Sequence, residues 1–170
     1  MALHEWIGLK GFNNLSDRAA MHALFECCSS LIWARRVAMR RPFDTRDALF
    51  ERADRVLAEI PEAELDHALD GHPRIGGRVN NSSSQREQAA VASADRQVLD
   101  ALAAGNRAYE AKFGHVYLVC ATGKSAAELL SILEDRMDND AETERRVMRV
   151  ELAKINRIRL DRMLGEDKTG

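Results

Sequence analysis

The residues best suited to chemistry lie in two short stretches near the middle of the 170-residue chain. The first stretch, residues 71–76, reads Gly-His-Pro-Arg-Ile-Gly, and the second, residues 84–88, reads Ser-Gln-Arg-Glu-Gln. Between them they supply an imidazole, a carboxylate, a hydroxyl and amides, groups that move protons and hydrogen-bond polar ligands. If the chain is an enzyme, this pattern favours acid–base catalysis.

The histidine of the first stretch is expected to lie in a turn. Gly71 and Gly76 tolerate unusual backbone angles, while Pro73 fixes its own φ and disfavours the helical region for His72. A single histidine in a loop is more often a turn residue than a catalytic one. Both interpretations of His72 stay open at this point.

The second stretch places a carboxylate on an apolar helix face. Glu87 precedes Ala90, Val91 and Ala94 by three, four and seven residues, so its side chain shares their stripe. An unpaired carboxylate there would be costly. Ser84 and Glu87 also have the spacing of a capping box, in which each side chain binds a backbone amide at the helix start. Capping and catalysis are both consistent with this spacing.

Arg159 is a permanent cation on the apolar side of the last predicted helix. It follows Ile155 by four residues and Leu152 by seven. Such a guanidinium needs an anion, and a structural ion pair or a side chain reaching the surface would explain it as well as a ligand would. Arg159 and Glu87 could pair with each other, or both could face one polar ligand.

The composition excludes several other kinds of protein. The net charge of −2 gives no general attraction to nucleic acid, and we expect the arginines at 35, 36, 40 and 41 to form a solvated face. No stretch approaches the roughly 18 apolar residues of a membrane helix. The three cysteines lack metal-ligand spacing, and no phosphate-binding loop or serine nucleophile motif occurs. We therefore expect no metal, no membrane and no nucleic acid, and a reducing, cytoplasmic location.

The apolar periodicity predicts an all-α protein, and the length fits one domain over residues 1–170. Helices are predicted over residues 15–29, 30–40, 45–60, 61–69, 84–104, 125–137 and 142–164, with the fifth breaking at Gly105. Residues 116–120 alone resemble a buried strand. Because they lack an evident pairing partner, we expect irregular extended backbone there.

Several sequence elements together resemble the OHCU decarboxylases, which act on 2-oxo-4-hydroxy-4-carboxy-5-ureidoimidazoline in urate degradation. In chain order they are Cys27-Cys28-Ser29-Ser30, Trp33-Ala34, Arg41-Pro42-Phe43, His72-Pro73, Ser84-Gln85-Arg86-Glu87-Gln88, Phe113-Gly114, Lys154-Ile155 and Arg159-Leu160. The resemblance extends from about Asn14 to Leu164. It implies an all-α, single-domain bundle of about seven to nine helices, with one irregular extended segment lining the pocket.

The resemblance also implies a site and a reaction. The family's proton-donating histidine falls on His72, with Glu87 and Arg159 as the other catalytic residues. The substrate-binding positions fall on Pro73, Ser84, Gln85, Arg86, Glu87, Gln88, Tyr117, Leu118, Val119, Cys120, Ala121 and Arg159. The family is cofactor-free and commonly a homodimer, and its small ureido-imidazoline substrate loses carbon dioxide to give (S)-allantoin. Tyr117 departs from the Phe of many relatives, and His115-Val116 departs from a frequent aromatic-Pro pair.

If the resemblance holds, Glu87 is expected to orient the imidazole of His72 or the substrate. A neighbouring carboxylate also favours the protonated imidazole unless burial opposes it. Arg159 binds an anionic or carbonyl edge of the substrate. Ser84, Gln88 and the backbone of residues 117–121 grip the ureido group and ring. Two other functions remain open: a helical interaction module without chemistry, and a hydrolase or lyase acting on a related ureido compound.

Overall fold

The computed structural model describes residues 7–70, 72–75, 86–89 and 95–165, and in these ranges it holds eight α-helices and no strand. The predicted all-α class is confirmed. The chain divides into two compact units, unit 1 with residues 1–71 and 153–170, and unit 2 with residues 72–152. Helix α9 (Ala141–Leu164) contributes its first half to unit 2 and its second half to unit 1. The single domain over residues 1–170 stays a prediction.

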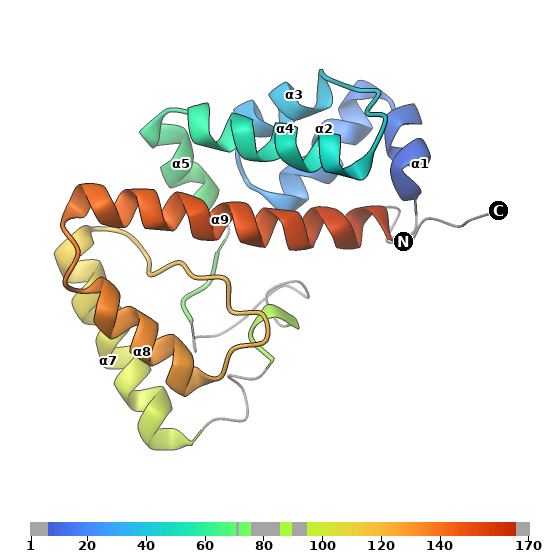
Figure 1. Ribbon diagram of the computed structural model, residues 1–170. Helices are drawn as coiled ribbons and strands as arrows, with labels where there is room; N and C mark the ends of the chain where they lie inside the picture. Colours follow the sequence, from blue (N-terminus) through green and yellow to red (C-terminus); the bar gives the residue numbers. More distant parts are fainter. Residues whose placement is uncertain (1–6, 71, 76–85, 90–94, 166–170) are drawn as a thin grey trace. The chain divides into compact units, whose positions relative to one another are not determined.

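In the described ranges, unit 1 is built from five helices of 7 to 14 residues and part of α9 (Figure 1). They are α1 (Gly8–Asn14), α2 (Asp17–Cys27), α3 (Leu31–Ala38), α4 (Arg46–Glu59), α5 (Glu62–Leu69) and the second half of α9. The side chains of Ser16, Ser30 and Thr45 accept the backbone N–H three residues later, as N-caps do. The predicted helices α2 to α5 are confirmed, whereas α1 was not predicted.

The core of unit 1 is largely apolar and includes Trp33. Trp33 is fully buried, and its indole N–H donates to the carbonyl of Ala53 at 3.0 Å. The expectation that the arginines near residue 40 are solvated is wrong for Arg41. Its guanidinium is buried and donates to the carbonyls of Phe12 and Leu15, which tie α1 and the start of α2 to the end of α3.

Unit 2 contains α7 (Arg96–Phe113), α8 (Ala126–Arg136) and the first half of α9. The predicted single helix over residues 84–104 is wrong. Residues 86–87 are helical and residues 88–89 form a turn, whereas α7 starts later because Asp95 caps it by accepting the N–H of Gln97 at 2.9 Å. The local cap therefore determines where this helix begins, despite a continuous apolar stripe.

The predicted break at Gly105 is also wrong, because α7 continues through it. A side chain at Gly105 would lie 3.1 Å from Leu133 of α8, so the glycine lets the two helices approach closely. The helix ends instead at Gly114, whose φ of 78° lies in the left-handed region typical of helix C-termini. One glycine thus serves packing and the other serves termination.

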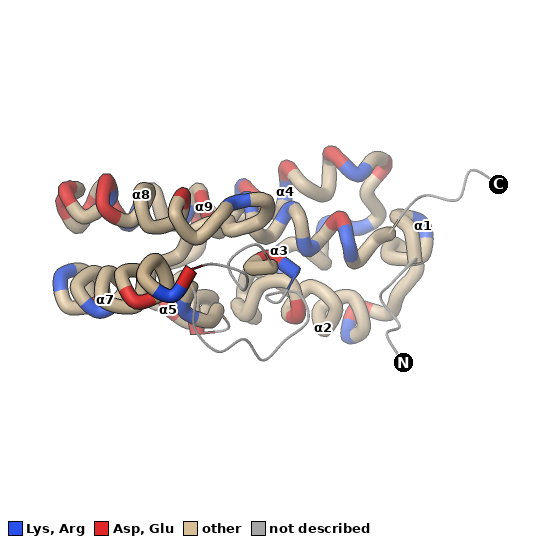
Figure 2. Tube along the Cα trace, turned by 90° about the horizontal axis from the view of Figure 1, so that it is seen from below, with Lys and Arg blue, Asp and Glu red and all other residues tan. Residues whose placement is uncertain are grey.

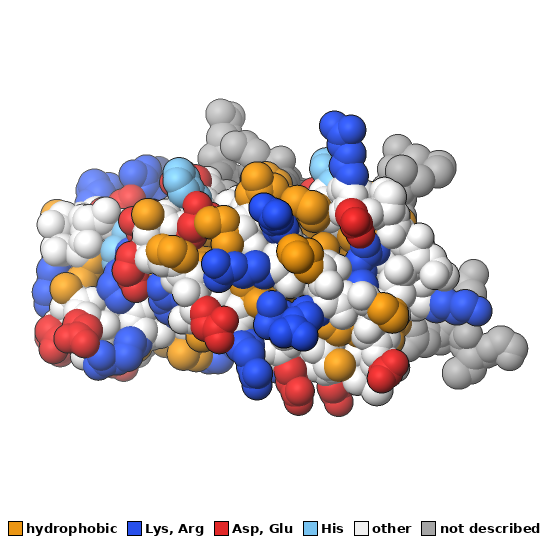
Figure 3. Space-filling view, turned by 90° about the horizontal axis from the view of Figure 1, so that it is seen from above, with side chains coloured by type: hydrophobic (Ala, Val, Ile, Leu, Met, Phe, Trp, Pro, Cys, Tyr) orange, Lys and Arg blue, Asp and Glu red, His pale blue; other side chains and the backbone are white. Residues whose placement is uncertain are grey.

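Charges of both signs are distributed along the helices. Acidic and basic residues alternate along α4 (Figure 2), and on the face drawn in Figure 3 basic side chains are interspersed with acidic and apolar ones. In the described ranges, no helix combines the length and the apolar character needed to cross a bilayer.

Candidate active site

The predicted histidine and glutamate both belong to unit 2. His72 and Pro73 are half-buried in non-helical backbone, as predicted from the Gly-His-Pro turn. Glu87 and Gln88 are each only 7% exposed, whereas Arg86 is exposed. Ser84 and Gln85 lie outside the described residues, so the proposed capping box at Ser84 and Glu87 stays a prediction.

The predicted extended segment, residues 116–120, and the adjoining Ala121 also belong to unit 2, and residues 117–121 are buried. The side chains of Tyr117, Val119 and Ala121 all join one apolar cluster with Leu102 and Leu129. Every second residue therefore faces the same core, which is the side-chain alternation of an extended chain. The segment is not part of a strand in the described ranges, in agreement with the sequence.

Charged side chains, rather than a neighbouring strand, hold the backbone of this segment. Arg136 donates from Nη1 to the carbonyl of Leu118 at 2.7 Å. The N–H of Cys120 donates to Glu151 Oε1 at 3.1 Å, and the carbonyl of Cys120 accepts from Lys124 Nζ at 2.8 Å. These bonds satisfy buried peptide groups that a sheet would otherwise satisfy.

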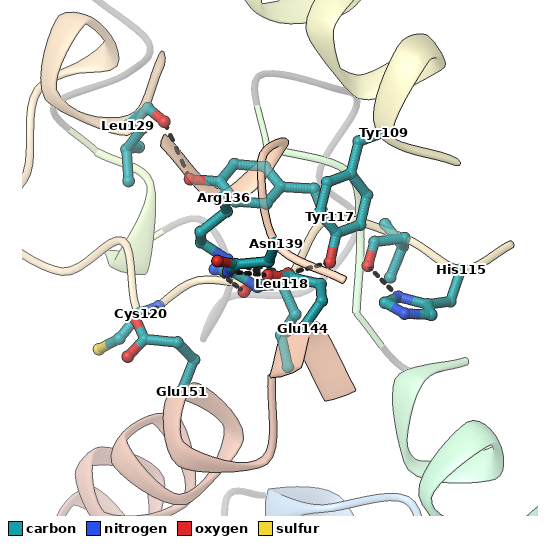
Figure 4. Close-up of polar contacts among 11 residues, drawn as sticks. Tyr109, His115, Tyr117, Leu118, Cys120, Leu129, Arg136, Asn139, Glu144 and Glu151 are labelled. Atoms are coloured by element: carbon teal, nitrogen blue, oxygen red, sulfur yellow. Dashed lines mark hydrogen bonds and ion pairs between the residues drawn. The ribbon is translucent and has the colours of Figure 1, made fainter. Parts of the chain in front are cut away.

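Arg136 is itself fixed by a buried polar network (Figure 4). Its Nε lies 2.9 Å from Glu144 Oε2, and the two side chains are 7% and 0% exposed. The hydroxyl of Tyr109 also donates to Glu144, and Asn139 Nδ2 does so at 3.1 Å. The guanidinium carbon lies 4.9 Å from the ring centroid of Tyr117, a cation–π distance.

The protonation states of the network follow from burial and charge. Burial raises the pKa of the Tyr109 and Tyr117 hydroxyls, and the hydrogen bond to Glu144 raises the pKa of Tyr109 further. Burial opposes the charge of Arg136, but the hydrogen bond and attraction of Glu144 outweigh it and raise the pKa of Arg136. The network therefore holds one ion pair and two neutral phenols over the ordinary pH range.

Our reading of the sequence missed this network, although one signal was present. Arg136 follows Leu129 by seven residues and Leu133 by three, so it lies on the apolar stripe of α8. The same argument singled out Arg159. No local pattern, however, links Arg136 to Glu144 or Tyr109, because these contacts form between separate helices.

Arg159 belongs to unit 1, where it is 8% exposed and donates from Nη1 to the carbonyl of Cys27 at 3.2 Å. The adjacent Cys28 is fully buried, and burial raises the pKa of its thiol to about 11. Arg159 thus faces the start of the Cys-Cys-Ser-Ser stretch. The convergence of Arg159 with His72 and Glu87 on one cleft stays a prediction.

The described residues contain no group of three His, Cys, Asp or Glu side chains arranged to hold a metal ion. Their buried cysteines, Cys27, Cys28 and Cys120, form no disulfide.

Comparison with known proteins identifies the family. A family model described as OHCU decarboxylase matches residues 13–161, which include all the predicted site residues. The chain belongs to the OHCU decarboxylase family. A crystal structure described as OHCU decarboxylase in the presence of (S)-allantoin matches with a TM-score of 0.73 and 27% identity, covering 88% of this chain and 99% of that one.

Curated relatives lie at a similar distance in sequence. The uric acid degradation bifunctional protein of Arabidopsis thaliana is 26% identical over 82% of this chain and 46% of its own length. The 2-oxo-4-hydroxy-4-carboxy-5-ureidoimidazoline decarboxylase of Xenopus laevis is 24% identical over 89% of this chain and 85% of its own. The chain thus spans less than half of the bifunctional relatives it matches and most of the Xenopus enzyme.

Proposed function

We propose that this chain decarboxylates 2-oxo-4-hydroxy-4-carboxy-5-ureidoimidazoline (OHCU) to (S)-allantoin and carbon dioxide. The observation that carries the proposal is the family match over residues 13–161, which spans both candidate stretches and Arg159. The similarity to a structure described in the presence of (S)-allantoin supports the product.

The reaction needs a proton and an electron sink within the substrate. The bond from the ring to the carboxylate breaks, carbon dioxide leaves, and the electron pair moves into the adjoining unsaturated ring. The ring nitrogen that receives the electron pair takes up the proton that the hydroxyl loses as it becomes a carbonyl, and a proton from the protein is added to the carbon that bears the ureido group. Because the ring accepts the electron pair, the protein's task is orientation, charge stabilisation and delivery of the proton to one face.

In the proposed mechanism His72 is the acid that delivers this proton. Its position in half-buried, non-helical backbone leaves the imidazole near solvent that can restore the proton. The buried Glu87 orients the imidazole or the substrate and favours the protonated ring. Arg159 binds an anionic or carbonyl edge of the substrate. The ureido group binds Ser84, Gln88 and the backbone of residues 117–121.

The assembly and location are part of the same proposal. We infer a homodimer from the family resemblance, which light scattering of the purified chain would test. We also infer a reducing, cytoplasmic location, because the chain's three cysteines are buried and none forms a disulfide.

The decisive experiment is circular dichroism of allantoin formed from freshly generated OHCU. With the chain present, we expect rapid formation of one enantiomer. A racemic product at the spontaneous rate would contradict the proposed function and favour an interaction module.

The role of His72 can be tested with a matched histidine control. We expect His72→Asn to lose enantioselective product formation by on the order of a hundredfold or more, since general acid catalysis contributes that much. The control is His67→Asn, because the His67 side chain is 68% exposed at the end of α5. Unchanged rate and handedness in His72→Asn would remove His72 from the mechanism. Equal losses in both variants would show that the effect is not specific to His72.

A further inference from the structure

The extended segment raises a physical question, because a buried chain without a neighbouring strand must satisfy its peptide groups in another way. In unit 2, three charged side chains on two helices and one turn do so. Arg136 comes from the end of α8, Glu151 from α9, and Lys124 from the turn that precedes α8. Each provides a charge-assisted hydrogen bond, which is stronger than a neutral one.

All three bonds fall on Leu118 and Cys120, the even-numbered residues of the segment. In an extended chain the N–H and C=O of successive residues point to opposite edges. The charged side chains therefore hold one edge of the segment. By this alternation the N–H and C=O of Val119 should point to the other edge, where a donor and an acceptor side by side would match the donor–acceptor pattern of a ureido group.

The support behind Leu118 is rigid. Arg136 is locked by Glu144, and Glu144 accepts hydrogen bonds from Tyr109 and Asn139 as well. The Tyr117 ring packs under the guanidinium, and its hydroxyl donates to the carbonyl of Leu129 at 2.9 Å. These hydrogen-bonded side chains restrict how far the backbone of the segment can shift (Figure 4).

We propose that Arg136, Glu151 and Lys124 are positioning residues that present the opposite backbone edge of residues 116–121 to the ureido group of the substrate. This inference rests on the proposed function, since it specifies how the segment named there would bind OHCU. Positioning residues of this kind act through the backbone and need not touch the substrate.

The proposal predicts a specific kinetic signature for Glu151. The ureido group is unchanged between substrate and transition state, so loss of its binding edge weakens both equally and raises KM without lowering kcat. We expect Glu151→Ala to raise KM for OHCU by on the order of tenfold, with kcat within about twofold. Glu151→Gln keeps a carbonyl oxygen that can accept the N–H of Cys120, and we expect it to restore most of the affinity.

Two controls separate positioning from general loss of structure. Glu142→Ala alters an exposed glutamate on the same helix, and we expect wild-type kinetics. Leu102→Ala creates a cavity in the same apolar core, and we expect a lower unfolding midpoint with KM nearly unchanged. Amide hydrogen exchange provides a second readout, in which residues 116–121 should exchange faster in Glu151→Ala than in Leu102→Ala.

The outcomes distinguish this inference from the function on which it rests. If wild-type protein forms racemic allantoin at the spontaneous rate, the proposed function fails. If wild-type protein is active but Glu151→Ala keeps its KM, the positioning role is wrong. A KM that rises equally in Leu102→Ala, or that Glu151→Gln fails to restore, would also overturn it by showing a purely structural effect.

Discussion

In unit 1 three helices, α2 to α4, begin at hydroxyl caps, whereas unit 2 is organised around a buried ion pair. In unit 1, Ser30 illustrates the local solution, because its hydroxyl caps α3 and also donates to Glu64 at 3.0 Å. In unit 2, Arg136 and Glu144 lie eight residues apart in sequence but draw in Tyr109, thirty-five residues from Glu144. Two regions of one chain thus depend to different degrees on local contacts, such as caps, and on contacts between residues far apart in sequence.

The largest effect that tests this comparison is expected from breaking the ion pair. Glu144→Gln leaves Arg136 as a buried charge without its carboxylate, which costs about 3–5 kcal/mol of unfolding free energy. Urea unfolding followed by far-ultraviolet circular dichroism measures this loss. Replacing both partners with apolar residues, as in Arg136→Met with Glu144→Leu, should recover much of it, because no unpaired charge remains.

The exposed pair of Glu142 and Arg146, on the same helix, serves as the control. Their atoms lie 3.2 Å apart with side chains 85% and 65% exposed. We expect Glu142→Gln to change stability by less than about 1 kcal/mol. A similarly small loss in Glu144→Gln would mean that the ion pair does not organise unit 2.

The second effect is a pH dependence carried by the chain's two tyrosines, both of which lie in unit 2. Their pKa values are raised by burial in the folded state. Above about pH 10, the unfolded chain therefore loses phenolic protons that the folded chain keeps. The unfolding free energy should fall as pH rises, by about 1.4 kcal/mol per tyrosine at pH 11.

Absorbance at 295 nm measures tyrosinate directly. At pH 10 the native chain should show little tyrosinate, while the chain in urea should be about half ionised. A Tyr109→Phe variant should show a weaker dependence of stability on pH. Native tyrosines that titrate normally near pH 10 would contradict the buried, neutral state of both phenols.

The same contrast explains what the sequence could predict. Helices α2 to α5, α8 and α9 follow from caps and apolar spacing that lie within a few residues of one another. The helix predicted over residues 84–104 was wrong because apolar spacing continues past the cap at Asp95, where α7 begins. Apolar spacing places both Arg159 and Arg136 on the apolar stripe of a helix. It cannot identify the residue on another helix with which either arginine pairs.

Some features of the candidate site were predictable from nearby residues, and others depend on contacts between distant residues. The turn at His72 and the extended backbone of residues 116–120 follow from local chemistry and agree with the structure, whereas Glu87 is buried although the turn at residues 88–89 interrupts the helix from which its position was argued. The side chains that hold the extended segment do not follow, because Glu151 and Cys120 meet only once α9 has packed. Family resemblance supplied the expected roles of His72, Glu87 and Arg159, which spacing alone left open.

The smallest effect tests whether local caps have equal weight in the two units. Thr45 caps α4 in unit 1, and Ser125 forms a capping box with Glu128 at the start of α8 in unit 2. Each hydroxyl accepts one backbone N–H at an exposed helix end, so Thr45→Ala and Ser125→Ala should each cost about 1 kcal/mol in urea unfolding. Thr45→Ser and Ser125→Asp retain a capping oxygen and should restore most of the loss. If Ser125→Ala cost as much as Glu144→Gln, the cap and the buried network would form one cooperative structure, and the separation of local from long-range stabilisation would not hold in unit 2.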